Sequence, residues 1–431
     1  MKKTLLFLIS IIFSTIVNGQ NLYFPPLTGD NWETISPYSL NWCDKRIDSL
    51  YNFLETNNTK AFILLKDGKI VLEKYFGATT LNSPLYWASA GKTITSFLIG
   101  KAQEEGFLDI TDKTSRYLGQ GWTNCTPEQE NKITVRHQLT MTTGLDDGVP
   151  DNHCYETECL IYKSDAGTRW AYHNAPYTLL DNVLENAIQT TMNQYLYRIL
   201  TLNCGITGTF VHLDYDNIFF SKARSMARFG LLILNNGNWN GNQIMTDAAY
   251  FEQMINTSQD LNKSYGYLWW LNGKTSFMVP TVQYVFSGKL NPDAPDDMIA
   301  ALGKNGQFLN VVKGQNLIWI RMGDAPDNTD IPYFLNNDIW KYINQLSSCN
   351  DVKINEIECK YAAIIENNVL KINSESQIAR IEIINLNGQI IESKIINCNS
   401  AEIPLNGIHN QVFILRIVFS NGKIKHELKK N

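Results

Sequence analysis

The sequence contains few of the patterns that mark metal-dependent or nucleic-acid-binding proteins. Six histidines are scattered over 431 residues without an HExxH pattern, and eight cysteines form no CxxC pair. These absences argue against the common zinc sites. The net charge is −5, whereas a surface that binds nucleic-acid phosphates needs a basic excess. We therefore expect no metal or other cofactor and no nucleic-acid partner.

The N-terminal apolar run is too short to span a bilayer, which takes about 20 residues. Residues 4–17 are almost wholly apolar, follow Lys2 and Lys3, and precede small residues around Gly19. This order is typical of a secretory signal peptide, residues 1–19, with cleavage between Gly19 and Gln20. We expect an exported protein that has no transmembrane anchor in its mature form.

The cysteines fit an exported protein, because export makes disulfides permissible. Cys154 and Cys159 are close enough in sequence to pair, whereas the pairing of the other cysteines stays open. The first cysteine, Cys43, is far from the cleavage site, so we expect no lipid at the mature N-terminus.

The order of the expected elements indicates an α+β domain over residues 20–349. An Asp-Gly turn between two β-rich runs predicts a hairpin over 61–77. Helical spacing follows at 93–102 and 222–235. Strand-like runs return at 265–270, 298–302, 308–312 and 317–322, before a helix over 331–346. This order predicts an antiparallel sheet built from both ends of the segment, with helices inserted between.

A second domain is expected over residues 355–431. Short alternating runs are separated there by Asn-Gly turns at 387–388, 406–407 and 421–422. Short strands at this spacing predict a small all-β sandwich, with the domain boundary near 349–355.

A serine and a lysine stand three residues apart at the start of an expected helix. Ser89 and Lys92 fall on one helix face, and the free N–H groups of a helix start favour an oxyanion. Lysine acts as a base only if its pKa falls well below about 10.4. The same spacing recurs at Ser420 and Lys423 in an expected turn, so this motif alone has little weight.

Two further motifs add weight to the SxxK motif. Tyr172 and Asn174 form a Tyr-x-Asn motif before a helical stretch, although residues 215–217 repeat that pattern. Lys304 lies in a Gly-Lys-Asn-Gly-Gln segment between two strand-like runs, where glycines let a substrate approach the backbone. The three motifs in this order are far more specific than any one of them.

Together these motifs resemble those of the serine β-lactamase and penicillin-binding-protein superfamily. The Tyr-x-Asn form is similar to the class C branch, which also contains esterases and aminohexanoate-oligomer hydrolases. Residues 133–145, 226–232 and 265–270 fit that branch, the last two being most similar to its esterase and oligomer-hydrolase members. The resemblance covers about residues 40–346. It implies a β-lactamase-like fold, with an antiparallel sheet flanked by helices and a mostly helical subdomain.

The resemblance also implies roles for the motif residues. Ser89 is implied to be the nucleophile of an acyl-enzyme, and Lys92 and Tyr172 to share the work of base and acid, in an order that stays open. Asn174 is implied to orient Lys92 or the substrate amide. Lys304 is implied to stabilise the phenolate of Tyr172, whose pKa we expect to be lowered toward neutrality by the two lysines.

Backbone N–H groups of Ser89 and Gln307 are implied to form the oxyanion hole. Asn305 departs from the family pattern, because members that process β-lactams usually carry a hydroxyl residue there. The sequence therefore favours an exported serine hydrolase that acts on a small-molecule or peptide-like ester or amide. The alternative is a β-lactam-binding or D-Ala-D-Ala peptidase-like protein that is acylated with little turnover. A Ser-His-Asp hydrolase is not indicated, because no GxSxG elbow is present.

The C-terminal segment, with its runs at 381–391 and 412–430, resembles the sorting domain of type IX secretion substrates. That resemblance implies the export machinery as a partner, with passage through the periplasm to the cell surface or the medium. A carbohydrate-binding or spacer sandwich is the alternative interpretation.

Overall fold

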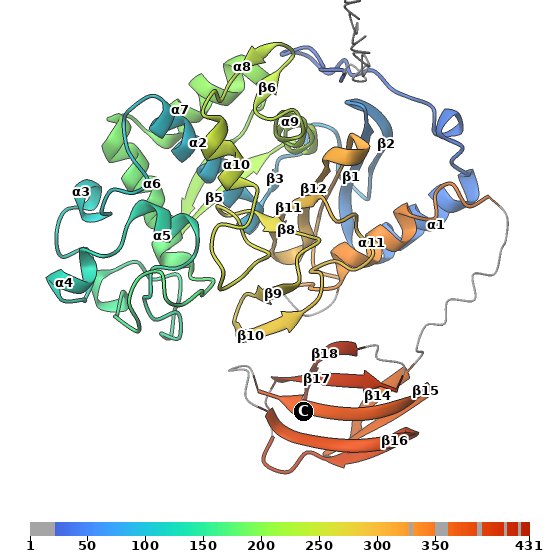
Figure 1. The fold of residues 1–431 in the computed structure, drawn as a ribbon. Helices are drawn as coiled ribbons and strands as arrows, with labels where there is room; N and C mark the ends of the chain where they lie inside the picture. The colour runs from blue at the N-terminus through green and yellow to red at the C-terminus, as the bar shows by residue number, and fades with distance from the viewer. Residues whose placement is uncertain (1–21, 327–330, 350–360, 386–389, 409–411, 421–423) are drawn as a thin grey trace, which may run out of the picture.

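A six-stranded antiparallel sheet forms the centre of the larger part of the molecule (Figure 1). The computed structural model describes residues 22–326, 331–349, 361–385, 390–408, 412–420 and 424–431, so the predicted signal peptide lies outside the described residues. The strand order is β2-β1-β13-β12-β11-β8. The strands are β1 (Thr59–Lys66), β2 (Lys69–Tyr75), β8 (Trp270–Leu271), β11 (Met298–Gly303), β12 (Gln307–Val312) and β13 (Leu317–Gly323). β1 pairs with β13, which confirms that the sheet is built from both ends of the segment.

The β1–β2 hairpin forms where the sequence predicts it. Pairing of Lys66 with Lys69 leaves only Asp67 and Gly68 in the loop. Both loop residues adopt left-handed backbone conformations, with φ of 51° and 81°. Two such residues make the type I′ turn, whose twist matches that of the paired strands.

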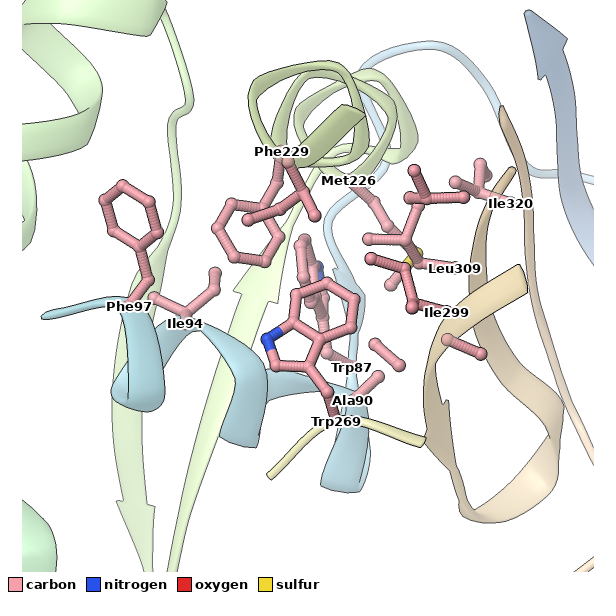
Figure 2. Packing of buried hydrophobic residues seen from close by; sticks show 14 of the residues in the cluster. Trp87, Ala90, Ile94, Phe97, Met226, Phe229, Trp269, Ile299, Leu309 and Ile320 are labelled. Carbon is pink, nitrogen blue, oxygen red and sulfur yellow. The ribbon is translucent and has the colours of Figure 1, made fainter. Parts of the chain in front are cut away.

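Helix α9 (Ala223–Leu234) packs closely on one face of the sheet, together with α2 (Lys92–Glu104). Figure 2 shows Met226 and Phe229 on α9, with Leu309 and Ile320 of the strands to their right. Gly230 permits this approach, because a Cβ atom there would lie 2.7 Å from the Leu309 side chain. A glycine inside a helix costs about 1 kcal/mol relative to alanine, and here the close packing offsets that cost. The helix predicted over 222–235 is confirmed.

The other face of the sheet is covered by α1 (Asp44–Thr56) and α11 (Leu335–Ile343) (Figure 1). Trp340 of α11 packs edge-on against Trp319 of β13, with 5.8 Å between ring centroids. The observed α11 is shorter than the helix predicted over 331–346. Both helices present apolar side chains to the sheet, as expected for amphipathic helices that cover a core.

Most of the remaining helices lie between β2 and α9 in the chain, as the predicted α+β order requires. They include α3 (Ser115–Leu118), α4 (Pro127–Glu130), α5 (Val135–Leu139), α6 (Asn174–Ile188), α7 (Met192–Leu196), α8 (Leu202–Cys204) and, after α9, α10 (Ala248–Met254). A small sheet of order β3-β5-β4, from β3 (Leu85–Tyr86), β4 (Thr209–Leu213) and β5 (Asp216–Ser221), was not predicted. Within the described ranges no helix is long and apolar enough to cross a bilayer.

The strand predicted over 265–270 is wrong. Only Trp270 and Leu271 pair in the sheet, against β11. The alternating aromatic pattern resembles a strand, but the backbone at Leu268 turns into the left-handed region with φ of 62°. The aromatic side chains are buried in a loop. A hairpin of β9 (Ser276–Val279) and β10 (Val282–Ser287) follows, which the sequence analysis missed.

The C-terminal residues form an all-β unit with a hydrophobic core of their own. Its antiparallel strands are β14 (Tyr361–Glu366), β15 (Val369–Ile384), β16 (Ile390–Pro404), β17 (Val412–Phe419) and β18 (Ile424–Lys430). Ile384 and Ile414 of this unit share a smaller apolar cluster with Val282 and Phe286 of the β9–β10 hairpin. Arg416 also donates a hydrogen bond of 2.5 Å to Tyr284 of that hairpin.

Two disulfides are present in the described residues. Cys154 pairs with Cys159, as expected from their spacing, and Cys43 pairs with Cys349. The second disulfide joins Cys43, just before α1, to Cys349, which follows α11. The two cysteines are 306 residues apart in the sequence, so the bond closes a loop that contains the whole sheet.

We predict that the Cys43→Ala/Cys349→Ala double variant unfolds more easily, by roughly 2–5 kcal/mol, because cross-linking a long loop restricts the unfolded chain. Urea denaturation without reductant measures the change in the free energy of unfolding. Cys204→Ala, at a buried free thiol, is the matched control for loss of cysteine packing. An unchanged midpoint in the double variant would show that the bond does not contribute to stability.

Candidate active site

Ser89 and Lys92 lie where a short 3₁₀ turn becomes a helix of the core. The turn η2 (Ala88–Gly91) leads directly into α2, of which Lys92 is the first residue. Side chains three positions apart eclipse one another in 3₁₀ geometry, which directs the hydroxyl and the amine to one side. Ala88, next to Ser89, has φ of 47°, a conformation that costs energy for a residue other than glycine.

Gly303, at the end of β11, lies against the backbone of Ser89. A Cβ atom added at Gly303 would be 2.6 Å from the carbonyl oxygen of Trp87 and 3.1 Å from the Ser89 nitrogen. The φ of Gly303 is −131°, which any residue adopts. Glycine is therefore required here for space, and the end of β11 forms a wall beside the Ser89 amide.

Tyr172 is buried beside Ser89, just before α6. The Ser89 side chain lies close enough to its phenol to lower the pKa of that phenol as a hydrogen-bond partner. The ring stacks on Trp270 with 5.9 Å between centroids, and Trp170 and Tyr265 complete the aromatic wall. The structure thus joins the predicted SxxK and Tyr-x-Asn motifs at one place.

The expected lowering of the Tyr172 pKa is wrong. Burial raises the pKa of this phenol well above its usual value, and the hydrogen bond with Ser89 offsets only part of that effect. Neither Lys92 nor Lys304 acts on it strongly enough to reverse the direction. Tyr172 is therefore a protonated phenol at neutral pH.

Lys92 has the near-neutral pKa that was expected of Tyr172. Its side chain is buried, and its Nζ lies 3.7 Å from the ring centroid of Tyr177 and 5.6 Å from that of Tyr172. Burial lowers the pKa of Lys92 to about 7, against the opposing effects of the Asp216 and Asp181 charges. A large fraction of this amine is therefore neutral near pH 7, as a general base requires.

Asn174 is held by a loop rather than by Lys92. Its side-chain amide donates to Asn152 Oδ1 and approaches His153 Nε2, both at 3.1 Å. The other ring nitrogen of His153 lies 2.7 Å from Asp216 Oδ1. None of the described interactions joins Asn174 to Lys92. No direct contact therefore supports the predicted role of Asn174 in orienting Lys92.

The contacts of Lys304 and Gln307 leave their expected roles as predictions. Lys304 is exposed, and its charge acts on Asp216 rather than on Tyr172. Burial disfavours ionisation of Asp216, yet the hydrogen bond of His153 and the charges of both His153 and the lysines hold its pKa below the usual value. Gln307 pairs with Gly303 on the next strand, and its side chain binds both backbone groups of Gly323. The backbone that faces Ser89 is that of Gly303.

A model of the Beta-lactamase family matches residues 58–322, which is more than half of the chain. The chain belongs to the beta-lactamase family. The predicted β-lactamase-like fold with a C-terminal all-β region is thereby confirmed. Curated protein sequences give no significant match to this beta-lactamase-family chain.

Solved structures share the fold of this beta-lactamase-family chain at low identity. A candidate 6-aminohexanoate-dimer hydrolase from Bacillus anthracis aligns over 75% of the chain and 89% of its own length, with 16% identity and a TM-score of 0.57. A candidate beta-lactamase from Bacteroides dorei aligns over 71% and 99%, with the same identity and TM-score. An octameric penicillin-binding protein homologue from Pyrococcus abyssi aligns over 90% and 96%, with 12% identity and a TM-score of 0.55. Identities this low show the fold and leave the substrate open.

Two acidic groups near Lys92 in this beta-lactamase-family site were not predicted from the sequence. Asp216 lies in the second Tyr-x-Asn pattern, at residues 215–217. Asp181 is buried on α6 between the core residues Leu180 and Leu184. A carboxylate on the apolar face of an amphipathic helix is a signal that could have pointed to Asp181.

We predict that Gly303→Ala slows labelling of Ser89 by a fluorophosphonate probe roughly 100-fold, because a displacement of about 1 Å at a reacting group costs that much. Gly314→Ala is the matched control, since its new Cβ meets only the end of the flexible Asp297 side chain. Labelling rates and melting temperatures of both variants test this. If the two variants were labelled at the same rate, close packing of Gly303 against Ser89 would not be required for the reaction.

Proposed function

We propose that this protein is a serine hydrolase that cleaves ester or amide bonds through an acyl-enzyme on Ser89. One observation carries the proposal: Ser89 lies on a 3₁₀ turn that leads directly into a buried lysine whose pKa is about 7, and the Ser89 side chain acts on the Tyr172 phenol. A serine hydroxyl needs an adjacent base to become a nucleophile, and a group with a pKa near the working pH is the most effective base.

The different states of Lys92 and Tyr172 divide the acid and base roles between them. Neutral Lys92 takes the proton as Ser89 Oγ bonds to the substrate carbonyl carbon, which gives a tetrahedral intermediate. The bond to the leaving group then breaks, and the protonated Tyr172 phenol supplies the proton that the leaving oxygen or nitrogen requires. Lys92 returns its proton to Tyr172, and water then cleaves the acyl-enzyme by the same steps in reverse.

The oxyanion of the intermediate needs backbone donors close to Ser89. We assign the Ser89 N–H and, as predicted from the sequence, the N–H of Gln307, which pairs with the Gly303 backbone that lies against Ser89. A pair of fixed backbone donors is often the largest single contribution to catalysis of acyl transfer.

An ester or linear amide fits this site better than a β-lactam. Asn305 stands where a hydroxyl residue is expected in β-lactam-processing members, and its amide donates to the Tyr86 hydroxyl. That bond occupies the side chain, which leaves it less free to bind an antibiotic carboxylate. The aromatic wall of Tyr172, Trp170 and Trp270 instead favours an apolar acyl or leaving group. The class C-like esterase and oligomer-hydrolase branch is therefore our preferred assignment.

Export and sorting stay part of the proposal. The signal peptide at 1–19 and the domain boundaries at 349 and 355 are predictions from the sequence, and the C-terminal all-β unit is compatible with a type IX sorting domain. We propose passage through the periplasm to the cell surface or the medium.

We predict that Ser89→Ala abolishes both ester hydrolysis and fluorophosphonate labelling. Lys92→Ala is expected to be nearly as damaging, because the groups of a catalytic unit are not additive. Ser420→Ala, at the other SxxK spacing, is the matched control and keeps full activity. Wild type and variants are assayed with short-chain esters, linear amides and a chromogenic cephalosporin.

Each result of this panel has a defined meaning. Ester or amide turnover that depends on Ser89 supports the proposal. Efficient cephalosporin hydrolysis would overturn the ester preference. Stoichiometric acylation of Ser89 by the β-lactam without turnover supports the penicillin-binding alternative, and unchanged labelling of Ser89→Ala would falsify the nucleophile.

We predict that Tyr172→Phe lowers kcat by roughly 100- to 10,000-fold, the usual cost of losing a general acid–base group. Tyr215→Phe is its matched control from the second Tyr-x-Asn pattern. Tyr215 contacts Tyr155 edge-on, with 5.1 Å between ring centroids, and is not part of the wall around Ser89. We expect Tyr215→Phe to stay within about tenfold of wild type. Steady-state kinetics on one activated ester compare the two variants, and the reverse order of effects would mean that the wrong tyrosine was chosen.

A further inference from the structure

A buried carboxyl group lies on α6 behind the proposed catalytic lysine. Asp181 is 2% exposed. It follows Tyr177 by four residues, so the two side chains share one face of α6. The Tyr177 ring is the one that Lys92 Nζ contacts at 3.7 Å. Asp181 therefore lies near the ring that Lys92 contacts, although among the described residues no ion pair or hydrogen bond joins Asp181 to Lys92.

The hydrogen bonds of Asp181 are incomplete for a carboxylate. Asn217 of β5 donates to Asp181 Oδ2, whereas Oδ1 is buried and has no hydrogen-bond partner within the described part of the chain. A buried oxygen without a partner costs about 1–3 kcal/mol, and more when it carries charge. A proton on the carboxyl removes that charge. The geometry thus favours the neutral acid unless a cation acts on it, and Lys92 is a buried cation whose charge acts on Asp181.

We propose that Asp181 is a positioning residue whose charge controls the protonation of Lys92 from the buried side of the site, so that Lys92 becomes a neutral base when Asp181 is protonated. The proposal rests on the proposed function, in which Lys92 activates Ser89. It adds a second buried group to the machinery, one that touches no substrate.

The electrostatics of the pair support this assignment. Burial raises the pKa of Asp181 to about 7, against the hydrogen bond of Asn217, while the charge of Glu185 adds to the rise. Burial lowers the pKa of Lys92 to about 7. Two interacting groups that titrate in one range lose their protons in two steps that belong to the pair. An ionised Asp181 holds Lys92 as an ammonium, and a protonated Asp181 releases it as an amine.

Asp216, on β5, also acts on Lys92, but from the wetter side. The Asp216 side chain is 38% exposed and paired with His153. Lys304 faces it as well, and the hydroxyl groups of Tyr172 and Tyr177 next to Lys92 stay protonated at neutral pH. Salt screens an exposed charge much more than a buried one. The effects of Asp216 and Asp181 on Lys92 can therefore be separated by ionic strength.

The test is a pH titration of Lys92 by NMR in full-length protein with ¹³C-labelled lysine side chains, the signal being assigned by its loss in Lys92→Met. In wild type we expect a broad two-step titration centred near pH 7. Asp181→Asn removes the buried negative charge, so the Lys92 midpoint falls by about half to one pH unit and the curve becomes a single step. The acid limb of the kcat/KM profile moves the same way, to lower pH, because less acid is needed to protonate the base.

Three comparisons make the result specific. The Asp181→Asn shift is expected to persist in 0.5 M salt, at a Debye length of about 4 Å, whereas an Asp216→Asn shift shrinks. Asp44→Asn, at an exposed acid on α1, leaves the midpoint unchanged. Asn217→Ala removes the donor that favours the carboxylate, so Asp181 stays protonated to higher pH and the Lys92 midpoint also falls. This last variant keeps the proposal testable if Asp181→Asn does not fold.

The NMR readout separates this proposal from the proposed function. A Lys92 midpoint that is the same in wild type, Asp181→Asn and Asn217→Ala overturns the control of Lys92 by Asp181, even if the enzyme hydrolyses esters. A shifted midpoint in a protein that shows no Ser89-dependent turnover supports that control and overturns the function instead.

Discussion

The burial of Lys92 is the constraint on which the rest of the structure depends. A lysine that is 5% exposed cannot keep its full positive charge at low cost, and its pKa falls from 10.5 to about 7. The unfolded chain binds this proton more readily, so the folded state at pH 7 is roughly 4–5 kcal/mol less stable than with an unshifted lysine. The penalty is absent above about pH 10.5 and grows as the pH falls toward 7. The penalty at pH 7 is a large fraction of the free energy of unfolding of an ordinary domain.

The surrounding packing both imposes and tolerates that penalty. The aromatic wall around Tyr172 excludes water from the lysine, and the close approach of η2 to Gly303 leaves no room for solvent beneath Ser89. The sheet supports this region through its large core and through the disulfide that joins Cys43 to Cys349. A site that requires a lysine shielded from water therefore requires a large, closely packed core around the η2 turn.

Local features of the site could be predicted from the sequence, because their causes are local. The spacing of Ser89 and Lys92 fixes their shared side of the turn, Asp67 and Gly68 fix the hairpin, and apolar periodicity fixes α9. The strand expected at 265–270 does not form, because the alternating aromatic residues are buried in a loop. Leu268 turns the backbone of that loop through its left-handed conformation.

Long-range features could not be predicted in this way. The backbone that lies against Ser89 depends on strand register, because Gly303 at the end of β11 approaches Ser89 and pairs with Gln307 of β12. The pKa of Tyr172 depends on how deeply its ring is buried, and a motif does not encode burial. The position of Asp216 depends on a small sheet, β3-β5-β4, that brings residues from before and after α6 together.

The two acids near Lys92 show why the same charge can serve different ends. Asp216 is half-exposed and bound to His153, so water and hydrogen bonds keep it ionised and its effect on Lys92 constant through the neutral range. Asp181 is dry and has one oxygen without a partner, so its charge responds to its neighbour. A fixed charge on the wet side raises the pKa of Lys92 by a constant amount. A variable charge on the dry side, as proposed for Asp181, raises the pKa of Lys92 only while Asp181 is ionised, so the strength of the base changes with the protonation of its neighbour.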